Sequence, residues 1–313
     1  MNKIGISLGD INGISPEITI KALNSLDVPA ENVVIAGSEV VFDYYKNKFG
    51  LSLNKKYEIV EIPLNAGDIR LCEDTKESGE FAFQSLKAVI DLAKEGKINA
   101  IVTAPISKNA INLAGYHFSG QTEVLEKYLA HDGQKAEMLF VSPKINVLLL
   151  TRHVSLFDAV KSIKKEVIIE KIEKLNSSLL GQFKINAPEI SVCALNPHAS
   201  EGGLFGDEEE KEILPALEVL KEKGVKISGP FPSDTLFQSV ISGKIKSDCT
   251  VALYHDQGLI PLKLFGFDDL VNATIGLDVL RTSPAHGVAF DIAGKNTANP
   301  NSMKSAIKLA LGI

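Results

Sequence analysis

The stretch Val251-Ala252-Leu253-Tyr254-His255-Asp256-Gln257-Gly258 determines how the rest of the sequence is interpreted. Residues 250–254 form a short apolar run of the kind found in buried parallel strands. The run stops at a His-Asp pair, and Gly258 is expected to give the backbone the freedom to turn there. Ligands bind outside the carboxyl ends of strands in an open α/β sheet, so His255 is placed where chemistry is expected.

Two other apolar runs end in the same way. Residues 145–150 run into Thr151-Arg152-His153, and residues 190–195 run into Asn196-Pro197-His198, so three of the six histidines follow a predicted strand. Three neutral imidazoles can hold a divalent ion and leave positions open for substrate. Imidazole favours zinc, cobalt, nickel or iron over magnesium. Each histidine could instead cap or satisfy a loop, and Asp256 could either orient its neighbour or stabilise the turn.

The composition indicates an α/β protein with one large unit or two domains. The chain has 313 residues, 45% of them hydrophobic, and no Trp. A net charge of −6 and a pI near 5.6 leave no broad basic surface for nucleic acid. The three cysteines, Cys72, Cys193 and Cys249, follow no metal-binding or redox spacing. Any anion must therefore be bound by a local cluster of residues.

The first residues carry no targeting signal. Met1-Asn2-Lys3 passes directly into a predicted strand at residues 3–8, and no run approaches the ~18 apolar residues of a membrane span. We therefore expect a cytoplasmic protein that contacts neither membrane nor nucleic acid.

The loop after the first strand reads Gly9-Asp10-Ile11-Asn12-Gly13-Ile14-Ser15-Pro16-Glu17 and leads into a helix. Ser15 is expected to cap this helix, with Pro16 at its first position. A glycine loop before a helix N-terminus could hold an anion. The chain contains neither a GxGxxG nor a Walker A pattern, so an ordinary dinucleotide-binding Rossmann unit is not indicated.

Periodicity and turn residues predict the other main elements. Strands are expected at residues 32–36, 57–61 and 98–102, and the last leads to Lys108, which could meet an anion or be solvated. A helix from Ser78 to Gly96 should bury the face formed by Phe83, Leu86, Val89, Ile90 and Ala93. We expect one continuous helix from residue 155 to about 179, and another that starts in capping-box fashion at Asp207 and Glu210 and bends at Pro215. Asp234 could cap the next helix or reach the site.

Several polar residues suggest a site for an anionic substrate. Gln121 and Thr122 precede a predicted helix at residues 124–129, which they could cap or where they could contact a ligand. Lys263, Asn272 and Arg281 are separated by apolar and glycine-rich segments, so folding can bring them together. The planar fork of arginine suits a two-point contact with phosphate or carboxylate.

The ordered motifs resemble one family. Leu195-Asn196-Pro197-His198-Ala199 with Glu201-Gly202-Gly203, Asp234-Thr235-Leu236-Phe237, Tyr254-His255-Asp256-Gln257-Gly258 and Arg281-Thr282-Ser283 resemble the 4-hydroxythreonine-4-phosphate dehydrogenases of vitamin B6 biosynthesis. The likeness runs from Gly5 to Pro300. The tail, His286-Gly287, Asp291-Ile292-Ala293-Gly294-Lys295 and Ala298-Asn299-Pro300, also resembles the cofactor loop of isopropylmalate and isocitrate dehydrogenases. That wider family binds nicotinamide cofactors without a Rossmann fingerprint.

The resemblance implies an NAD- or NADP-dependent oxidation of 4-phosphohydroxy-L-threonine at its C3 alcohol, followed by loss of carbon dioxide to give 3-amino-2-oxopropyl phosphate. One divalent ion, zinc, magnesium or cobalt, would be bound by His153, His198 and His255. Substrate would be bound by Gln121, Thr122, Lys263, Asn272 and Arg281, and the cofactor by His286, Gly287, Asp291 and Asn299. Asp234, Asp256 and Lys108 are candidates for the general base. The implied active unit is a homodimer whose partner supplies part of the metal shell.

The resemblance also implies the architecture. We expect two α/β/α domains of the isocitrate and isopropylmalate dehydrogenase type with the active cleft between them. The first would comprise residues 1–117 and 285–313, and the second, with the metal, substrate and dimerisation functions, residues 118–284.

Two departures from the family pattern affect the substrate. The family usually has histidine where this chain has Gln121, an uncharged amide that cannot donate a proton as a cation, and the loop at residues 11–15 also differs. The nearest alternative is a sister dehydrogenase acting on threonate or erythronate 4-phosphate. A metal-dependent hydrolase or lyase without NAD, and a non-catalytic sensor of phosphorylated ligands, are alternatives of other classes.

Overall fold

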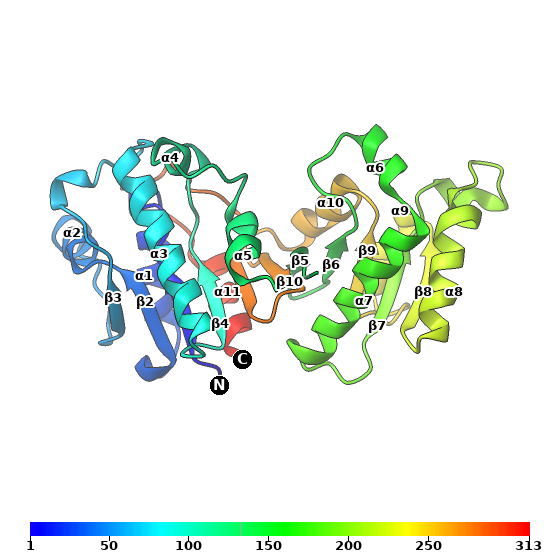
Figure 1. Cartoon of the computed structure of the whole chain (residues 1–313), viewed down its shortest axis with the longest axis horizontal. Helices are drawn as coiled ribbons and strands as arrows, with labels where there is room; N and C mark the ends of the chain where they lie inside the picture. The colour runs from blue at the N-terminus through cyan, green and yellow to red at the C-terminus, as the bar shows by residue number, and fades with distance from the viewer. Residues whose placement is uncertain (132) are drawn as a thin grey trace. The chain divides into compact units, whose positions relative to one another are not determined.

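The computed structural model describes residues 1–131 and 133–313, which form two compact units. Unit 1 comprises Met1–Ala136 and Val271–Ile313, and unit 2 comprises Glu137–Leu270. Figure 1 labels most of the helices and strands of both units. The division by contacts falls at different residues from the predicted boundaries after 117 and 284, because α5 (Gln121–Leu129), β10 (Val271–Ile275) and β11 (Leu280–Pro284) pack within unit 1.

The sheet of unit 1 has the strand order β3-β2-β1-β4-β11-β10. All neighbours are parallel except β10 and β11, which are antiparallel. The other strands are β1 (Ile4–Ser7), β2 (Val33–Gly37), β3 (Glu58–Glu61) and β4 (Ala100–Thr103). The expected strands at residues 3–8, 32–36, 57–61 and 98–102 are thus confirmed within two residues at each end.

Helices cover the sheet of unit 1. They are α1 (Ser15–Ser25), α2 (Glu39–Phe49), α3 (Lys76–Lys94), α4 (Lys108–Leu113), α5 and α11 (Asn301–Leu311), with short 3-10 turns at Ala30–Asn32 and Ala66–Asp68. The long helix α3 packs against β1, β2 and β4, and α11 packs against β4, β10 and β11. The predicted apolar face of α3 is confirmed, since Phe83, Leu86, Val89, Ile90 and Ala93 all lie in one buried cluster.

The sheet of unit 2 has the strand order β5-β6-β9-β7-β8. These strands are β5 (Glu137–Val141), β6 (Val147–Leu149), β7 (Glu189–Cys193), β8 (Lys226–Phe231) and β9 (Cys249–Ala252). Only β5 runs antiparallel to its neighbour β6. The three strands predicted to end at histidines, β6, β9 and β7, are therefore adjacent and parallel, and their carboxyl ends lie at one edge.

The helices of unit 2 are α6 (Leu156–Ser162), α7 (Lys165–Gly181), α8 (Leu214–Glu222), α9 (Ser233–Ile241) and α10 (His255–Gly266). The expectation of one helix from 155 to 179 is wrong, because the backbone is extended at Ile163 and Lys164 between α6 and α7. Ile163 is buried there, and the Glu212 carboxylate accepts from Lys164 Nζ at 2.7 Å and from the Lys165 N–H at 2.9 Å. Glu212 thus provides hydrogen-bond acceptors at the point where the second helix, α7, begins.

Three residues considered as helix caps, for Asp234 as one of two alternatives, make no cap. The Ser15 hydroxyl does not cap α1 but donates to the Pro105 carbonyl at 2.7 Å. Neither Asp207 nor Asp234 provides a side-chain cap, since a π-helical turn at Glu209–Ile213 precedes α8 and Pro232 precedes α9. Pro215, where a bend is expected, lies at the start of α8 directly after the π-helical turn at Glu209–Ile213, so the helix is irregular just before the proline.

Gly258 does not free a turn, because it lies inside α10. A Cβ at this position would lie 2.7 Å from Leu149 Cδ2 and 2.9 Å from Val147 Cγ1. The glycine therefore lets α10 approach β6 closely. Among the described residues, no helix is long and apolar enough to cross a membrane.

Candidate active site

Arg281 is held inside unit 1 by its neighbours in the sheet. It is 4% exposed, and its Nε and Nη2 donate to Thr103 Oγ1 at 2.9 and 2.6 Å. Its Nη1 donates to Thr274 Oγ1 at 3.2 Å, and Nη2 also donates to Gln121 Oε1 at 3.2 Å. Arg281 pairs with Thr274 across β10 and β11, and with Ile101 of β4. The strand register thus fixes the guanidinium.

The charge of Arg281 lacks a bonded counter-ion within the part of the chain that the structure describes, because its hydrogen-bond partners there are neutral oxygens. Burial lowers the pKa of its guanidinium to about 9, and the negative charge of Glu123 opposes this shift. The side chain still carries its charge at neutral pH. An anion that contacts the guanidinium would offset its desolvation, so this arrangement is suited to binding an anion.

Gln121 contacts Arg281, and Lys108 lies near the start of α5. The Gln121 amide is fixed at both ends, because its Nε2 donates to the Ala104 carbonyl at 3.1 Å while its Oε1 accepts from Arg281. Lys108 is the exposed first residue of α4, and its Cε lies 3.8 Å from the position that a Cβ on Gly120 would take. The structure therefore brings Lys108 close to the start of α5 and places Gln121 in direct hydrogen-bond contact with Arg281.

The other predicted substrate-binding residues are distributed over both units. Thr122 is buried in the first turn of α5. Asn272 lies in β10, and its Oδ1 is a buried acceptor without a hydrogen-bond partner among the described residues. Buried acceptors are rarely left unpaired, so a donor from a ligand or a water suits this position. Lys263 belongs to unit 2, where it is exposed on α10.

Asp10, in the loop after β1, is a buried carboxyl group for which the sequence predicts no role. Its Oδ1 accepts from the Asn12 N–H at 2.8 Å, and the Ser78 hydroxyl lies 3.5 Å from its Oδ2. Burial raises its pKa to about 6; the Asn12 hydrogen bond opposes the shift and the charge of Asp74 adds to it. A perturbed carboxyl group at the end of a parallel strand is typical of functional sites. Its position just after a predicted strand is the sequence feature by which Asp10 could be recognised as a candidate site residue.

Two of the three predicted metal ligands come together in unit 2. The rings of His153 and His255 lie 5.7 Å apart between centroids, whereas the His198 ring lies 6.2 Å from that of Phe205. The described residues of this chain contain no group of three or more His, Cys, Asp or Glu side chains that could hold a metal ion. The three-histidine set therefore stays a prediction.

His255 is oriented by its neighbour. Its Nδ1 lies 2.7 Å from Asp256 Oδ1, at the start of α10. A carboxylate at Nδ1 fixes the ring and leaves Nε2 for a metal, so the donor chemistry of His153 and His255 fits two positions of a divalent ion. Asp256 is exposed, as is Asp234 in the first turn of α9.

His198 lies in a strained loop. His198, Ala199, Ser200 and Glu201 all have positive φ, at 53°, 53°, 62° and 46°, and Gly202 and Gly203 continue the left-handed run. The left-handed conformation costs about 1–2 kcal/mol for each residue with a side chain. Such strain persists only where the surroundings impose it, often at functional sites. The sequence motif showed the glycines of this loop but not the strain at the residues before them.

The segment predicted to bind the cofactor is attached to α1. The Ile14 N–H donates to the Val288 carbonyl at 3.0 Å. Lys21 Nζ donates to the Asn296 and Ala298 carbonyls at 3.0 and 3.3 Å, and Glu17 Oε1 accepts from the Ala298 N–H at 2.8 Å. Glu17 is buried and forms an ion pair with Lys21 at 2.7 Å. From the sequence, Glu17 is recognisable only as part of a helix start, and this role is not.

The four predicted cofactor residues lie along this attached segment. His286 Nδ1 lies 3.0 Å from the Gly287 carbonyl, and Asn299 Oδ1 accepts from the Asn301 N–H at 3.0 Å. Gly287, Asp291 and Asn299 are exposed. An ordered backbone with exposed polar groups, beside the start of α1, is compatible with a nicotinamide cofactor.

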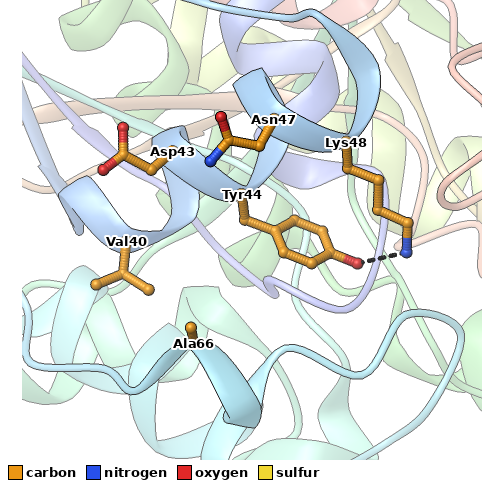
Figure 2. Close-up of a pocket in the computed structure, with 6 residues that line it drawn as sticks. All are labelled: Val40, Asp43, Tyr44, Asn47, Lys48 and Ala66. Atoms are coloured by element: carbon orange, nitrogen blue, oxygen red, sulfur yellow. Dashed lines mark hydrogen bonds between the residues drawn. The ribbon is translucent and has the colours of Figure 1, made fainter.

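A pocket on α2 lies apart from these predicted residues. Figure 2 shows its lining, formed by Val40, Asp43, Tyr44, Asn47, Lys48 and Ala66. Lys48 Nζ donates to the Tyr44 hydroxyl at 2.7 Å. The lining includes no predicted site residue, so this pocket is not part of the candidate active site.

Comparison with known proteins defines the class. The model of the family described as pyridoxal phosphate biosynthetic protein PdxA matches residues 15–310. A 4-hydroxythreonine-4-phosphate dehydrogenase from Sulfurihydrogenibium sp. (strain YO3AOP1) is 38% identical, with 99% of this chain and 98% of the relative covered. A putative D-threonate 4-phosphate dehydrogenase from Oceanobacillus iheyensis is also 38% identical, over 98% and 96%.

A solved structure agrees with these relatives. The crystal structure of 4-hydroxythreonine-4-phosphate dehydrogenase from Klebsiella pneumoniae has a TM-score of 0.88 and 34% identity, and 99% of each chain is covered. Fold and sequence thus define a dehydrogenase with the isocitrate dehydrogenase-like fold, an oxidoreductase acting on a CH–OH group. The chain belongs to the PdxA family of pyridoxal phosphate biosynthesis.

Proposed function

We propose that this chain catalyses the NAD- or NADP-dependent, metal-dependent oxidation of 4-phosphohydroxy-L-threonine, with decarboxylation to 3-amino-2-oxopropyl phosphate. The observation that carries the proposal is Arg281, a buried cation whose bonded partners in the described chain are neutral, in a member of a dehydrogenase family. A phosphorylated substrate supplies the anion that this guanidinium lacks.

Substrate binding is assigned to the residues predicted for it. Arg281 contacts the phosphate or carboxylate, and Gln121 holds its Nη2 in place. The unpaired Asn272 Oδ1 accepts from a substrate donor, and Thr122 and Lys263 complete the set. Contacts of this kind orient the reacting carbon, and orientation contributes more to rate than affinity alone does.

Metal binding is assigned to His153, His198 and His255, with Asp256 orienting His255 through Nδ1. When bound, the divalent ion supplies Lewis acidity at the C3 oxygen and the nicotinamide supplies the hydride acceptor. The ion is zinc, magnesium or cobalt. The bond of Asp256 to His255 favours an orienting role for this carboxylate over that of general base, which leaves Asp234 and Lys108 as candidates.

The reaction balances as an oxidation and a carbon–carbon cleavage. The oxidation would remove the C3 hydrogen as hydride, the chemistry that a nicotinamide supplies when bound, and the hydroxyl proton would pass to the general base. The resulting β-keto acid then loses carbon dioxide, and the carbon that carried the carboxylate gains a proton. The cofactor is bound by His286, Gly287, Asp291 and Asn299, on the segment that Glu17 and Lys21 hold against α1.

A homodimer is the proposed active unit, with the partner completing the metal site. Unit 2 exposes large apolar side chains, on and directly after α10 (Ile260, Leu264 and Phe267), on and before α6 (Val154, Leu156 and Phe157) and in the loop after His198 (Leu204 and Phe205). Leu264 is 77% exposed. Apolar patches of this kind mark surfaces that a protein partner covers. The proposal also accounts for the two adjacent histidines, rather than three, among the residues that the structure describes.

The alternative is a dehydrogenase of D-threonate or erythronate 4-phosphate. A specific observation favours keeping it: the amide of Gln121 is already hydrogen-bonded to Arg281 and to the Ala104 carbonyl. Relatives with either name are equally similar to this chain. Both activities use the same metal, cofactor and phosphate sites and differ in recognition of the substrate amine.

A parallel assay tests the two readings. Purified protein with a divalent metal and NAD or NADP is given 4-phosphohydroxy-L-threonine or D-threonate 4-phosphate, and reduced nicotinamide is followed by absorbance with and without a chelator. Faster, chelator-sensitive reduction with the amino substrate supports the proposal. Reduction with the sugar acid alone moves the chain to the alternative, and reduction with neither refutes both.

A further inference from the structure

Glu209 is a buried carboxylate placed by an irregular turn. It is 1% exposed and lies at the start of the π-helical turn Glu209–Ile213, just before α8. A π-helical turn contains an extra residue, which changes the direction of the side chains around it, and such turns are frequent at functional sites.

The carboxylate of Glu209 accepts hydrogen bonds from the residues just before His198. Its Oε1 accepts from the Leu195 N–H and the Asn196 N–H, both at 2.8 Å, and its Oε2 accepts from Asn196 Nδ2 at 2.8 Å. The same Nδ2 also donates to Glu208 Oε2 at 2.7 Å. Hydrogen bonds to an ionised acceptor are roughly twice as strong as neutral ones. The carboxylate therefore anchors the two residues at the end of the β7 segment.

These contacts also close the loop at residues 196–206, called here the His198 loop. A Cβ on Gly206, whose φ is 126°, would lie 2.7 Å from both Asn196 Nδ2 and Glu208 Oε2. The two ends of the loop thus meet at Asn196, and no larger residue fits. Within the loop, the left-handed run begins at His198, two residues after the anchored Asn196.

We infer that Glu209 is a positioning residue for His198: it fixes the base of the loop, so that the strained backbone presents the imidazole in one orientation for the metal. The inference rests on the proposed function, in which His198 is a metal ligand. Residues that orient a metal ligand without contacting the metal typically change the metal affinity about 10- to 100-fold when they are replaced.

The test measures metal binding directly. The full chain is stripped with a chelator and titrated with Co²⁺, whose visible absorption reports both affinity and ligand geometry. Glu209→Gln keeps the shape of the side chain but turns one of its two acceptors into a donor that faces N–H groups. The matched control is Glu218→Gln, an exposed position on α8. His198→Gln serves as the reference for loss of the ligand.

Glu209→Gln is expected to weaken Co²⁺ binding about 10- to 100-fold and to alter the absorption spectrum, as a structural role remote from the site would not. Glu218→Gln should match the wild type. Affinity and spectrum unchanged in Glu209→Gln but altered in His198→Gln would overturn the inference and leave the proposed function intact. If His198→Gln also binds Co²⁺ like the wild type, the metal role of His198 fails, and the inference fails with it.

A second variant covers the case in which Glu209→Gln does not fold, as judged by Tm without metal. Asn196→Ala removes the side-chain contacts to Glu208 and Glu209 and keeps both backbone N–H groups on Glu209. It is expected to weaken Co²⁺ binding by a smaller factor than Glu209→Gln, with a changed spectrum. Wild-type affinity and spectrum in Asn196→Ala would then overturn the inference.

Discussion

Replacement of Asp10 by asparagine should make the protein more stable at neutral pH. The carboxyl group is fully buried after β1, and its strongest favourable contact is the 2.8 Å hydrogen bond from the Asn12 N–H. The amide of asparagine keeps an oxygen for that bond but carries no charge. Asp10→Asn therefore removes the desolvation of a carboxylate without removing its main partner.

The size of the effect follows from the pKa. Burial raises the pKa of Asp10 from its ordinary value of 3.8 to about 6. A raised carboxyl pKa means that the stability contributed by this group is full below pH 3.8 and is lost as the pH rises through about 6. The shift corresponds to about 3 kcal/mol, at 1.36 kcal/mol for each pKa unit. Asp10→Asn should therefore gain up to about 3 kcal/mol over the wild type at pH 8 and almost nothing at pH 4.

The assay is the free energy of unfolding by urea at several pH values from 4 to 8. Asp43→Asn on α2 is the control, because Asp43 is exposed and the change should have no such pH dependence. In Asp74→Asn, which removes a charge that raises the Asp10 pKa, the loss of stability should shift to lower pH. A difference between wild type and Asp10→Asn that is the same at pH 4 and pH 8 would refute this account of the buried carboxyl group.

Three further predictions concern the site and the assembly. Arg281→Lys keeps a positive charge, but a lysine cannot reach Thr103, Thr274 and Gln121 together. KM for the substrate should therefore rise about 10- to 100-fold, which corresponds to the loss of one charge-assisted hydrogen bond. An unchanged KM would contradict the role of Arg281 in anion binding. Lys21→Met leaves the buried Glu17 carboxylate unpaired and should cost about 3 kcal/mol in unfolding experiments and raise KM for the nicotinamide cofactor. The double variant with Glu17→Gln should recover part of that stability, and no recovery would argue against the ion pair. Leu264→Lys places a charge on the exposed face of α10 and should shift the protein from dimers toward monomers in sedimentation. Leu113→Lys in unit 1 is the control. If Leu264→Lys sediments with the same mass as the wild type, this face is excluded from the interface.

The sequence predicted the parts of the fold that depend on local pattern. Apolar runs located the strands that end at His153, His198 and His255, and their parallel pairing follows from the long crossovers between them. The amphipathic spacing of Phe83, Leu86 and Val89 located the buried face of α3. Such patterns hold because each residue depends mainly on its neighbours in the element.

The errors arose where a distant residue overrides local preference. The break between α6 and α7 depends on Glu212, which lies 47 residues beyond Lys165. Ser15 donates to Pro105 instead of capping its helix. The buried carboxylates of Asp10, Glu17 and Glu209 were missed because acidic residues in loops and helix starts are usually exposed. Only the folded chain shows that backbone N–H groups, or for Glu17 also a lysine, surround them.

The most direct test of the proposed activity is the stoichiometry of its two products. With 4-phosphohydroxy-L-threonine, a divalent metal and a nicotinamide cofactor, we predict that one molecule of carbon dioxide is released for each nicotinamide reduced, and that a chelator stops both. Carbon dioxide release without nicotinamide reduction, or no turnover of this substrate with either cofactor, would contradict the account.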